Sequence, residues 1–329
     1  MTMSIPDNER ALALRLFDRL DVSDPGNGDL LFNIFGVGNT VESVDRPYER
    51  FRRYEELLLL LRGHNATRYD QIHKGTAFWF LSWLAFDLRN YPKALFYMDA
   101  AGSEDLRRAP HCWLTEPAGA FLTLSNPAER GPGWHVGRLR GLLSEQIARF
   151  NGISSEAPLT VDDIAKKFVT KLLAEPRHRT IVSAWYLHLL EFEERRTDLT
   201  LRSSLGGSIE PFLDYLLRGG LILESLLKTL YSAGAATRTL RTLGAIYNSD
   251  DFKRDFGSGF ATTAHDVKEI LGTLTGGQIR DAFTVSAQVR NTTGHNLVWD
   301  DAFTDPSAFS QMFEFETNAM LFVVLRKFL

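Results

Sequence analysis

The chain has 329 residues, of which 44% are hydrophobic and 24% are charged, an ordinary globular composition that excludes an intrinsically disordered protein. This length favours two domains, with one large helical unit as the alternative. The chain contains 37 Lys and Arg and 41 Asp and Glu, so its net charge is −4. This charge excludes a histone-like or ribosomal nucleic-acid binder with a broadly basic surface. The one cysteine, Cys112, excludes a disulfide framework and a thiolate-rich zinc site, and it favours a reducing, cytoplasmic setting.

No targeting or membrane segment is expected. Residues 1–20 carry charged side chains throughout and hold no uninterrupted apolar region, so they do not resemble a secretory leader. The densest apolar run, Phe78 to Phe86, is about half of the ~20 residues that a membrane-spanning helix needs. We therefore expect a cytoplasmic protein that does not cross a membrane.

Helical periodicity dominates the chain, and the first elements already show it. Asp7 and Asn8 are candidate caps of a first helix, whose apolar stripe is Ala11, Leu14, Phe17 and Leu20. After a Pro-Gly-Asn-Gly break, residues 30–35 form the most strand-like run, and a helix is expected over 47–61. The glycines of segment 36–41 superficially suggest a dinucleotide fingerprint, but the third glycine is missing and no strands follow, so a turn is favoured.

A helical hairpin is expected next, with a first helix over about 68–89 and a second that starts at Pro92, a favourable first-turn position. The segment resembles one tetratricopeptide unit, because its large and small residues fall where that repeat places them: Phe78, Leu81, Tyr91, Ala94 and Ala101. Ser82 and Ala85 depart from the repeat, and no second copy follows at the same period. The sequence therefore predicts a degenerate, tetratricopeptide-like region of helical hairpins.

Proline- and glycine-rich breaks at 127–132 and 151–158 flank one more helix. Thr160 and Asp163 have the spacing of a capping box that opens a helix to about residue 173, and another helix follows from about 180 to 196. The small, polar segment 203–208 marks a plausible boundary. We therefore expect a helical, tetratricopeptide-like region over 1–155, connecting helices over 156–207 and a helical bundle over 208–329, an all-α protein.

Within this last region, a long helix is expected over about 209–231, with shorter helices at 237–247 and 263–274. Gly276-Gly277 opens a helix that ends at Arg290. Asp305 and Pro306 signal the start of the last helix, which runs to the C-terminus. This helix is apolar on more than one side, which indicates that it is buried in a core or at a subunit contact: Phe309, Met312, Phe313, Phe315, Met320, Phe322 and Leu325.

Most candidate chemical groups have ordinary explanations. His111 and Cys112 are adjacent, so a helix would point them in different directions, and a nucleophile pair is not expected. His188 and Glu191 have helical spacing, but no further metal ligands gather near them. We expect a surface or core histidine there, and we expect neither a metal ion nor a cofactor.

The exception is the segment Arg290-Asn-Thr-Thr-Gly-His295. Arg290 continues the apolar stripe of its helix, and a guanidinium in such a position needs a partner. Glu224 interrupts the apolar stripe of the long helix upstream and is the first candidate. Asn291 and His295 share a face if the helix continues, whereas Gly294 could instead break it. A fixed cation, an amide and a titratable imidazole suit phosphodiester chemistry.

Arg-polar-x-x-x-His near the end of an all-helical region resembles the signature of the HEPN superfamily. The helix with Gly219-Gly-Leu-Ile-Leu-Glu-Ser-Leu-Leu-Lys228 resembles the opening helix of such domains, and the likeness covers about residues 208–329. The resemblance implies a helical bundle of four to five helices, usually a homodimer with both motifs at one cleft. It also implies a metal-independent ribonuclease of a toxin, defence or RNA-processing system, although some members only bind.

We therefore expect an endoribonuclease with RNA as its partner. Arg290 would hold the scissile phosphate, Asn291 would orient the phosphate or the imidazole, and His295 would transfer the proton. Attack by the 2′-hydroxyl would leave a 2′,3′-cyclic phosphate without a metal or cofactor. The alternative is a non-catalytic interaction, nucleotide-binding or RNA-binding protein, since residues 208–329 carry 11 Lys and Arg against 14 Asp and Glu.

Two further interactions are also expected. A homodimer through the C-terminal domain would cover the apolar sides of the last helix and double the groups at the site. The N-terminal helical region could bind a protein partner or inhibitor, or an RNA.

Overall fold

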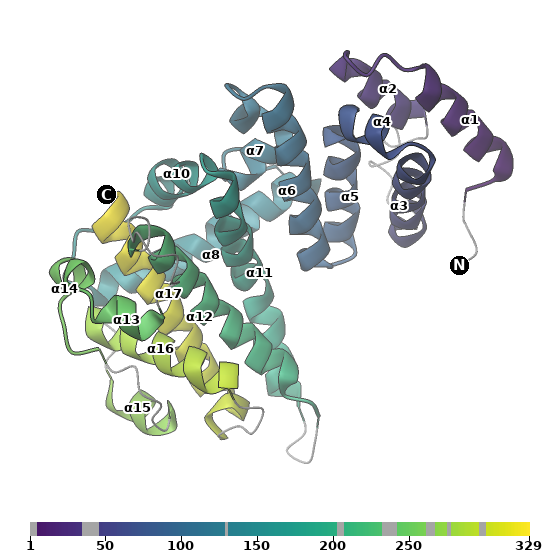
Figure 1. The fold of residues 1–329 in the computed structure, drawn as a ribbon. Coiled ribbons are helices and arrows are strands. Elements are labelled where there is room, and N and C mark those ends of the chain that lie inside the picture. The colour runs from purple at the N-terminus through teal and green to yellow at the C-terminus, as the bar shows by residue number, and fades with distance from the viewer. Residues whose placement is uncertain are drawn as a thin grey trace. The chain divides into compact units, whose positions relative to one another are not determined.

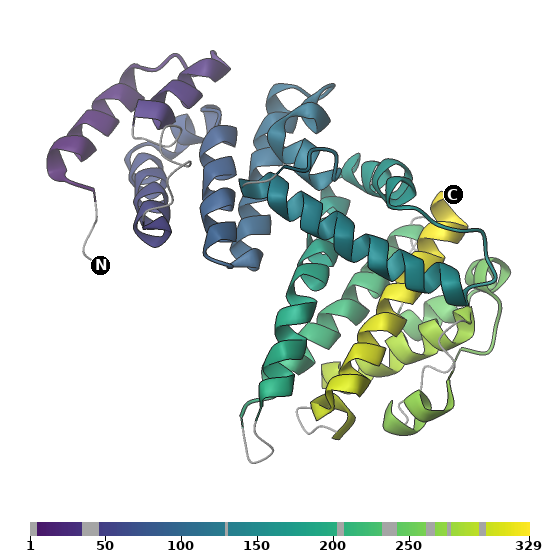
Figure 2. The same ribbon diagram turned by 180° about the vertical axis from the view of Figure 1, so that it is seen from behind.

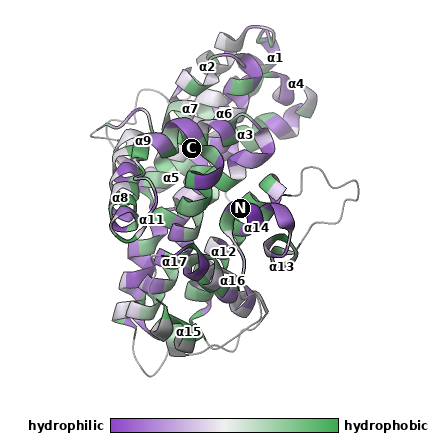
Figure 3. Cartoon of the chain, turned by 90° about the vertical axis from the view of Figure 1, so that its left-hand side faces the viewer, coloured by the Kyte–Doolittle hydropathy of each residue, from purple (hydrophilic) through white to green (hydrophobic). Residues whose placement is uncertain are grey.

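The computed structural model describes residues 5–34, 46–128, 131–202, 207–231, 242–260, 267–274, 278–295 and 301–329; the side chain of His295 is not among the described ones. Helices make up this part of the chain, and it contains no strand, so the predicted all-α class is confirmed (Figures 1 and 2). Hydrophilic and hydrophobic residues alternate along most helices, as Figure 3 shows, because each buries one side.

The chain divides into two compact units, Met1–Gly137 and Arg138–Leu329. The predicted limits at residues 155 and 207 stay predictions. The first unit holds α1 (Asp7–Arg19), α2 (Pro25–Ile34), α3 (Pro47–His64), α4 (Ala66–Gln71), α5 (Gly75–Asp87), α6 (Tyr91–Arg108), η1 (Trp113–Thr115), α7 (Pro117–Leu122) and the start of α8 (Gly131–Ile153).

The hairpin of α5 and α6 is the most closely packed pair of the first unit. Leu81 and Ala94 are fully buried between the two helices, and Ser82 is buried with them. The Ser82 hydroxyl donates a hydrogen bond to the carbonyl of Ala94 at 2.8 Å, so this departure from the repeat pattern is satisfied across the hairpin. A helical hairpin is therefore present, and the resemblance to a tetratricopeptide unit stays a prediction.

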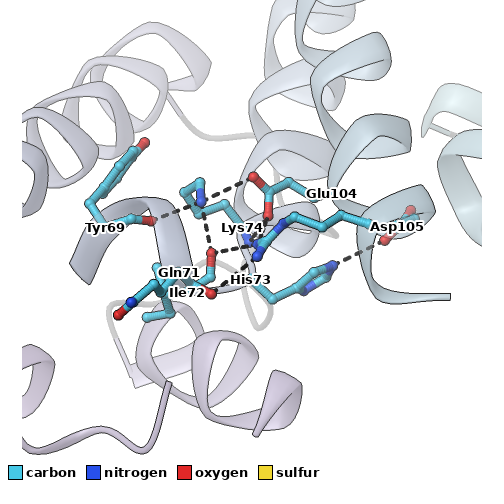
Figure 4. A network of polar contacts seen from close by, with 8 residues as sticks. Tyr69, Gln71, Ile72, His73, Lys74, Glu104 and Asp105 are labelled. Atoms are coloured by element: carbon cyan, nitrogen blue, oxygen red, sulfur yellow. Dashed lines mark hydrogen bonds and ion pairs between the residues drawn. The ribbon is translucent and has the colours of Figure 1, made fainter. Parts of the chain in front are cut away.

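The predicted single helix over 68–89 is wrong, because α4 ends at Gln71 and α5 begins at Gly75. A buried lysine explains the break (Figure 4). Lys74 is 4% exposed, and its ammonium donates to the carbonyls of Tyr69 at 2.9 Å and Ile72 at 2.7 Å. In a continuous helix these carbonyls would accept hydrogen bonds from backbone N–H groups. Here the Lys74 ammonium donates to them instead, so the helix can end without leaving them unpaired.

The strand-like run also belongs to a helix, α2, so that expectation is wrong for residues 30–34. A short apolar run does not distinguish a buried strand from a buried helix, and Leu31 and Phe32 are both 1% exposed. At Gly28 a Cβ atom would overlap the backbone carbonyl of His73, so this glycine allows close packing inside a helix. Phe35 and the glycines of segment 36–41 lie outside the described residues.

The first helix is present, but its predicted details differ. Pro6 precedes α1, and no side chain caps the helix, so Asp7 and Asn8 do not act as caps. Ala13 and Phe17 are the buried residues of α1. The buried face of α1 therefore differs from the predicted apolar stripe. Phe17 is the one residue of that stripe that is fully buried.

The second unit contains the remaining described helices: the rest of α8, α9 (Val161–Asp163), η2 (Ile164–Val169, a π-helix), α10 (Thr170–Leu173), η3 (Pro176–His178), α11 (Arg179–Leu201), α12 (Glu210–Tyr231), α13 (Leu243–Tyr247), α14 (Asp250–Phe256), α15 (Val267–Thr273), α16 (Ile279–His295), η4 (Asp301–Thr304) and α17 (Pro306–Phe328). The helices α12, α16 and α17 pack against one another, and α11 packs against α12 and α17. This group forms the core that positions the candidate site.

Two predicted helix starts in this unit are confirmed. Thr160 and Asp163 form a reciprocal capping box at α9, and the Asp305 carboxylate accepts a hydrogen bond from the Ala308 amide at 2.7 Å. These short polar side chains satisfy backbone N–H groups that the first turn of a helix leaves unpaired.

The last helix is buried within a single chain. Of the seven apolar residues named for it, Leu325 is half-buried, and the other six are at most 6% exposed: Phe309, Met312, Phe313, Phe315, Met320 and Phe322. The premise that a second copy must cover them is therefore wrong, because α11, α12 and α16 already do. The homodimer stays a prediction without this support. None of the described helices combines the length and the apolarity that crossing a membrane requires.

Candidate functional site

The motif residues lie at the C-terminal end of α16, which continues through Gly294 to His295. Of the two alternatives that the sequence leaves open, the structure has the continued helix, so Asn291 and His295 lie on one face of it. The side chain of His295 lies outside the described residues, and its part in the site stays a prediction.

Arg290 forms the ion pair with Glu224 that the sequence predicts. Its Nε donates to Glu224 Oε2 at 2.8 Å, which joins α16 to α12. The carboxylate side chain is 4% exposed, and the guanidinium side chain is 25% exposed. A buried carboxylate without a cation would be costly, so the pair explains why an acidic residue interrupts the apolar stripe of α12.

Gly220 allows α12 and α16 to approach each other at this point. A Cβ atom there would lie 2.5 Å from Arg290 Cβ and 3.2 Å from Arg290 Cα, closer than packed carbon atoms come. The stem of Arg290 therefore rests on Gly220, and its head reaches the next turn of α12, where Glu224 stands. The glycine is what brings the guanidinium to the carboxylate.

A second cation completes the cluster, and the sequence analysis assigned it no role. Lys228 Nζ lies 2.5 Å from Glu224 Oε1, one helical turn further along α12. The four-residue spacing of Glu224 and Lys228 is the signal that could have found it, because Glu and Lys at that spacing face each other on a helix. The Glu224 carboxylate thus holds one cation on each oxygen.

Asn291 lies beside this cluster and is half-buried. Its side-chain oxygen accepts a hydrogen bond from Arg290 Nη1 at 3.1 Å, which fixes the orientation of the guanidinium further. Arg290, Asn291, Glu224 and Lys228 therefore come together, with two positive charges against one negative charge. Such a fixed, partly exposed cluster with a surplus positive charge can bind an anion.

No group of three or more His, Cys, Asp or Glu side chains that could hold a metal ion occurs in the described part of the chain.

A second polar pair, His188 and Glu316, lies inside the bundle. Nε2 of His188 is 3.5 Å from Glu316 Oε2, and the two side chains are 3% and 2% exposed. Burial lowers the pKa of His188 to about 3, and burial raises the pKa of Glu316 well above its usual range. Burial therefore keeps His188 neutral at pH 7 and favours the neutral form of Glu316.

Sequence reasoning missed this pair because it compared His188 with a residue nearby in the chain. Glu191 instead lies 2.5 Å from Arg218 of α12. The partner of His188 comes from α17, and neither of its ring nitrogens has a hydrogen bond among the described residues. Gly219 lies beneath the pair, where a Cβ atom would overlap the Glu316 carboxyl. The pair is enclosed, so it does not meet a substrate directly.

In comparisons with known proteins, no family model, no curated protein and no solved structure matches the chain.

Proposed function

We propose that the protein is a metal-independent endoribonuclease that cleaves RNA to 2′,3′-cyclic phosphate ends at the Arg290 cluster. Arg290 binds the scissile phosphate, and Asn291 orients the phosphate or the imidazole. His295 moves a proton at the 2′-hydroxyl or at the leaving 5′-oxygen. The attacking oxygen belongs to the substrate, so the reaction needs no metal-bound water.

The observation that carries this proposal is the Glu224–Arg290 pair at 2.8 Å, with the guanidinium partly exposed. A guanidinium that one carboxylate and one amide hold in place is preorganised, and preorganised cations stabilise the charge that builds up on a phosphate in the transition state. The described contacts of Arg290 use Nε and Nη1. A guanidinium has five N–H donors, enough to hold these partners and a phosphate together.

The resemblance to the HEPN superfamily supports the same reaction. The Arg-Asn-x-x-x-His spacing falls at the end of a helix inside an all-helical bundle, which is the context that the resemblance requires. It also supports a role in a toxin or defence system and a paired arrangement of two sites, both of which belong to the proposal.

A second candidate function is a non-catalytic interaction or nucleotide-binding protein. The observation that favours it is the same ion pair, because an arginine paired with a buried glutamate can serve to hold two helices together. In that case Arg290 would stabilise the bundle, and no cleavage would depend on His295.

Cleavage of a labelled RNA in EDTA distinguishes the two candidates. Wild-type protein should cleave it, and His295→Ala should lower the rate by about 100-fold or more, the usual contribution of a general acid or base. Arg290→Ala should abolish cleavage, and Arg290→Lys should restore little, because lysine lacks the planar two-pronged grip. Replacing the 2′-hydroxyl with 2′-O-methyl should block the reaction.

Arg280→Ala is the matched control, since Arg280 lies on the same helix and is exposed. It should cleave at the wild-type rate. Cleavage that depends strictly on added Mg²⁺ or Mn²⁺, or that proceeds at the wild-type rate in His295→Ala, would contradict the proposal. Circular dichroism of each variant shows whether the fold is kept.

A further inference from the structure

Several enclosed carboxylates in the described part of the chain each pair with two cations, and Glu104 and Glu224 are two of them. In the first unit, Glu104 pairs with Lys74 at 3.0 Å (Figure 4). It also pairs with Arg107 at 2.6 Å. In the second unit, Glu224 pairs with Lys228 and Arg290 in the same way. The chemistry of the two clusters is alike, so their remaining contacts decide what each can do.

Both cations of the Glu104 cluster also donate hydrogen bonds to backbone carbonyls. Lys74 donates to two carbonyls besides its carboxylate, which accounts for the three N–H donors of an ammonium. Arg107 donates to the carbonyls of Gln71 at 3.2 Å and Ile72 at 3.0 Å. These contacts tie the α4–α5 connection to α6. The cluster is a structural clamp, and Lys74 is too deeply buried to meet a ligand.

The cations of the Glu224 cluster have no such backbone partners among the described residues. Among the described residues, Lys228 contacts Glu224, and Arg290 contacts Glu224 and the side chain of Asn291. Lys228 and Arg290 are 28% and 25% exposed, whereas Glu224 is 4% exposed. The carboxylate therefore faces the core, and both cations reach solvent with donors to spare.

Charge and geometry together specify the ligand. Two cations and one carboxylate leave a net positive charge of one at a partly exposed position. Because each cation is held by a different oxygen of one carboxylate, their heads lie close enough to contact one small anion. A phosphate group fits, since its oxygens can accept hydrogen bonds from a guanidinium and an ammonium at once.

We propose that Lys228 is the second phosphate-binding residue of this site, and that Glu224 positions it beside Arg290. This inference rests on the proposed function, because it takes the anion to be a phosphodiester of RNA. Lys228 contacts the backbone phosphate and not a base, so it adds affinity without sequence preference. Glu224 is a positioning residue that does not touch the substrate.

The test measures binding separately from cleavage. The probe is a fluorescent 2′-O-methyl RNA oligonucleotide, which cannot react through a 2′-hydroxyl, and the readout is its Kd at several NaCl concentrations. Lys228→Gln should weaken binding about 5- to 10-fold at low salt. It should also lower the slope of log Kd against log salt by about one, because one fewer phosphate contact is made. Lys228→Arg should restore most of the binding.

Lys327→Gln is the matched control. Lys327 is 26% exposed and lies 2.7 Å from the Asp255 carboxylate, so it is another lysine–carboxylate pair of the same unit. This variant should bind the oligonucleotide as the wild type does. Inorganic phosphate should compete with the oligonucleotide in wild-type protein and compete less well in Lys228→Gln.

Three results would overturn the inference: no binding by the wild type, equal Kd and slope for the two glutamine variants, or equal competition by phosphate in Lys228→Gln and wild type. A wild type that binds through Lys228 but cleaves no RNA would leave this inference standing and refute the proposed function. If the wild type cleaves RNA and Lys228→Gln cleaves it with the same KM, the proposed function stands and this inference is refuted. Urea unfolding of each variant shows that the fold is kept.

Discussion

At the scale of single residues, Glu224 organises the candidate site. Its carboxylate is almost fully buried, and each of its oxygens contacts a cation from a different turn or helix. A buried charge is tolerated only where partners compensate for the lost hydration. An acidic residue within an apolar stripe therefore signals a cation opposite it, which is why the pairing with Arg290 could be predicted before the fold was known.

The first prediction concerns this carboxylate. Glu224→Gln should lower the free energy of unfolding by about 3 kcal/mol, because two cations lose their shared counter-charge while remaining half-buried. Urea unfolding followed by circular dichroism measures it. The control is Glu314→Gln, which removes an exposed pair with Arg149 and should change stability by less than about 1 kcal/mol. Equal effects of the two substitutions would contradict the central position of Glu224.

Glu316 shows how burial alone changes the chemistry of a carboxyl group. Because burial raises its pKa in the folded state, the folded protein binds a proton that the unfolded chain releases near pH 4.5. This contribution to stability is present below that pH and is lost as pH rises towards the folded pKa. His188 acts oppositely: its folded pKa of about 3 makes stability fall as pH drops from about 6.5.

The second prediction follows from these signs. Glu316→Gln keeps the shape of the side chain and cannot ionise, so it should gain stability relative to the wild type as pH rises from 5 to 8. The gain should approach about 1.4 kcal/mol per pH unit wherever the wild-type carboxyl stays protonated only in the folded state. Unfolding free energies at each pH measure it. Glu314→Gln is again the control, and parallel pH profiles for Glu316→Gln and wild type would contradict the prediction.

At the scale of helices, the sequence predicted elements whose ends carry local signals. The capping box at Thr160 and the cap at Asp305 are chemical features of a few adjacent residues, and both are present. The break at residues 72–74 could not be found in this way, because it depends on Glu104 of another helix. The α2 error has a similar origin, since neighbours from elsewhere in the chain decide how a short apolar run is buried.

The third prediction concerns the approach of α12 to α16. Gly220→Ala should destabilise the protein by about 1–3 kcal/mol, because the new methyl group would meet the stem and backbone of Arg290. It should also weaken RNA cleavage by displacing the guanidinium. The intrinsic preference of alanine for helices, about 1 kcal/mol, acts in the opposite direction.

Gly141→Ala provides the matched control. Gly141 lies inside α8, and a Cβ atom there would have no neighbour within 4 Å. The substitution should therefore stabilise the protein by about 0.5–1 kcal/mol. The sign of the change in thermal or urea unfolding separates the two positions, and stabilisation by Gly220→Ala would show that the helices have room to spare.

At the scale of the whole molecule, the burial of α17 means that charged substitutions in this helix cannot serve as a simple test for a dimer. Phe313 is 1% exposed, and its ring stacks on Phe192 with centroids 3.8 Å apart. The apolar excess seen in the sequence is covered by other helices of the same unit, among them α11, α12 and α16, and α8 through Phe150, whose ring meets Phe322. Composition alone reveals how much apolar surface a helix has, but not how many neighbours cover it.

The fourth prediction is that Phe313→Asp unfolds the second unit and does not yield a folded monomer. A buried, unpartnered carboxylate together with the loss of a large aromatic ring should cost more than about 4 kcal/mol. Circular dichroism and light scattering measure helicity and mass. Leu221→Asp is the control, since Leu221 is 42% exposed on α12, and it should keep the helical fold. A folded, helical Phe313→Asp monomer would instead point to a dimer contact at α17.

Part of the candidate site could be predicted, because some of its residues carry a signal in the sequence and others do not. Arg290 and Glu224 each place a charge on an apolar stripe, and Asn291 follows in the same motif. The structure brings all three together. Lys228 breaks no pattern, because a lysine on a helix four residues after a glutamate is an ordinary surface feature. Glu316 lies in a helix that is apolar on nearly all sides. Its neighbour His188 depends on the way α11 packs against α17, which the sequence of α17 does not reveal.

Gly219 and Gly220 have one more consequence, for the freedom of α12 to move as a body. The first meets α11 and α17 through His188 and Glu316, and the second meets α16 through Arg290. A rotation of α12 about its axis, or a slide of one residue along it, would bring a larger side chain into one of these two tight contacts. Relief on one side would produce a collision on the other, so the helix has a single allowed setting. The orientation of Glu224 and Lys228 towards Arg290 is thereby fixed by two residues that have no side chains of their own.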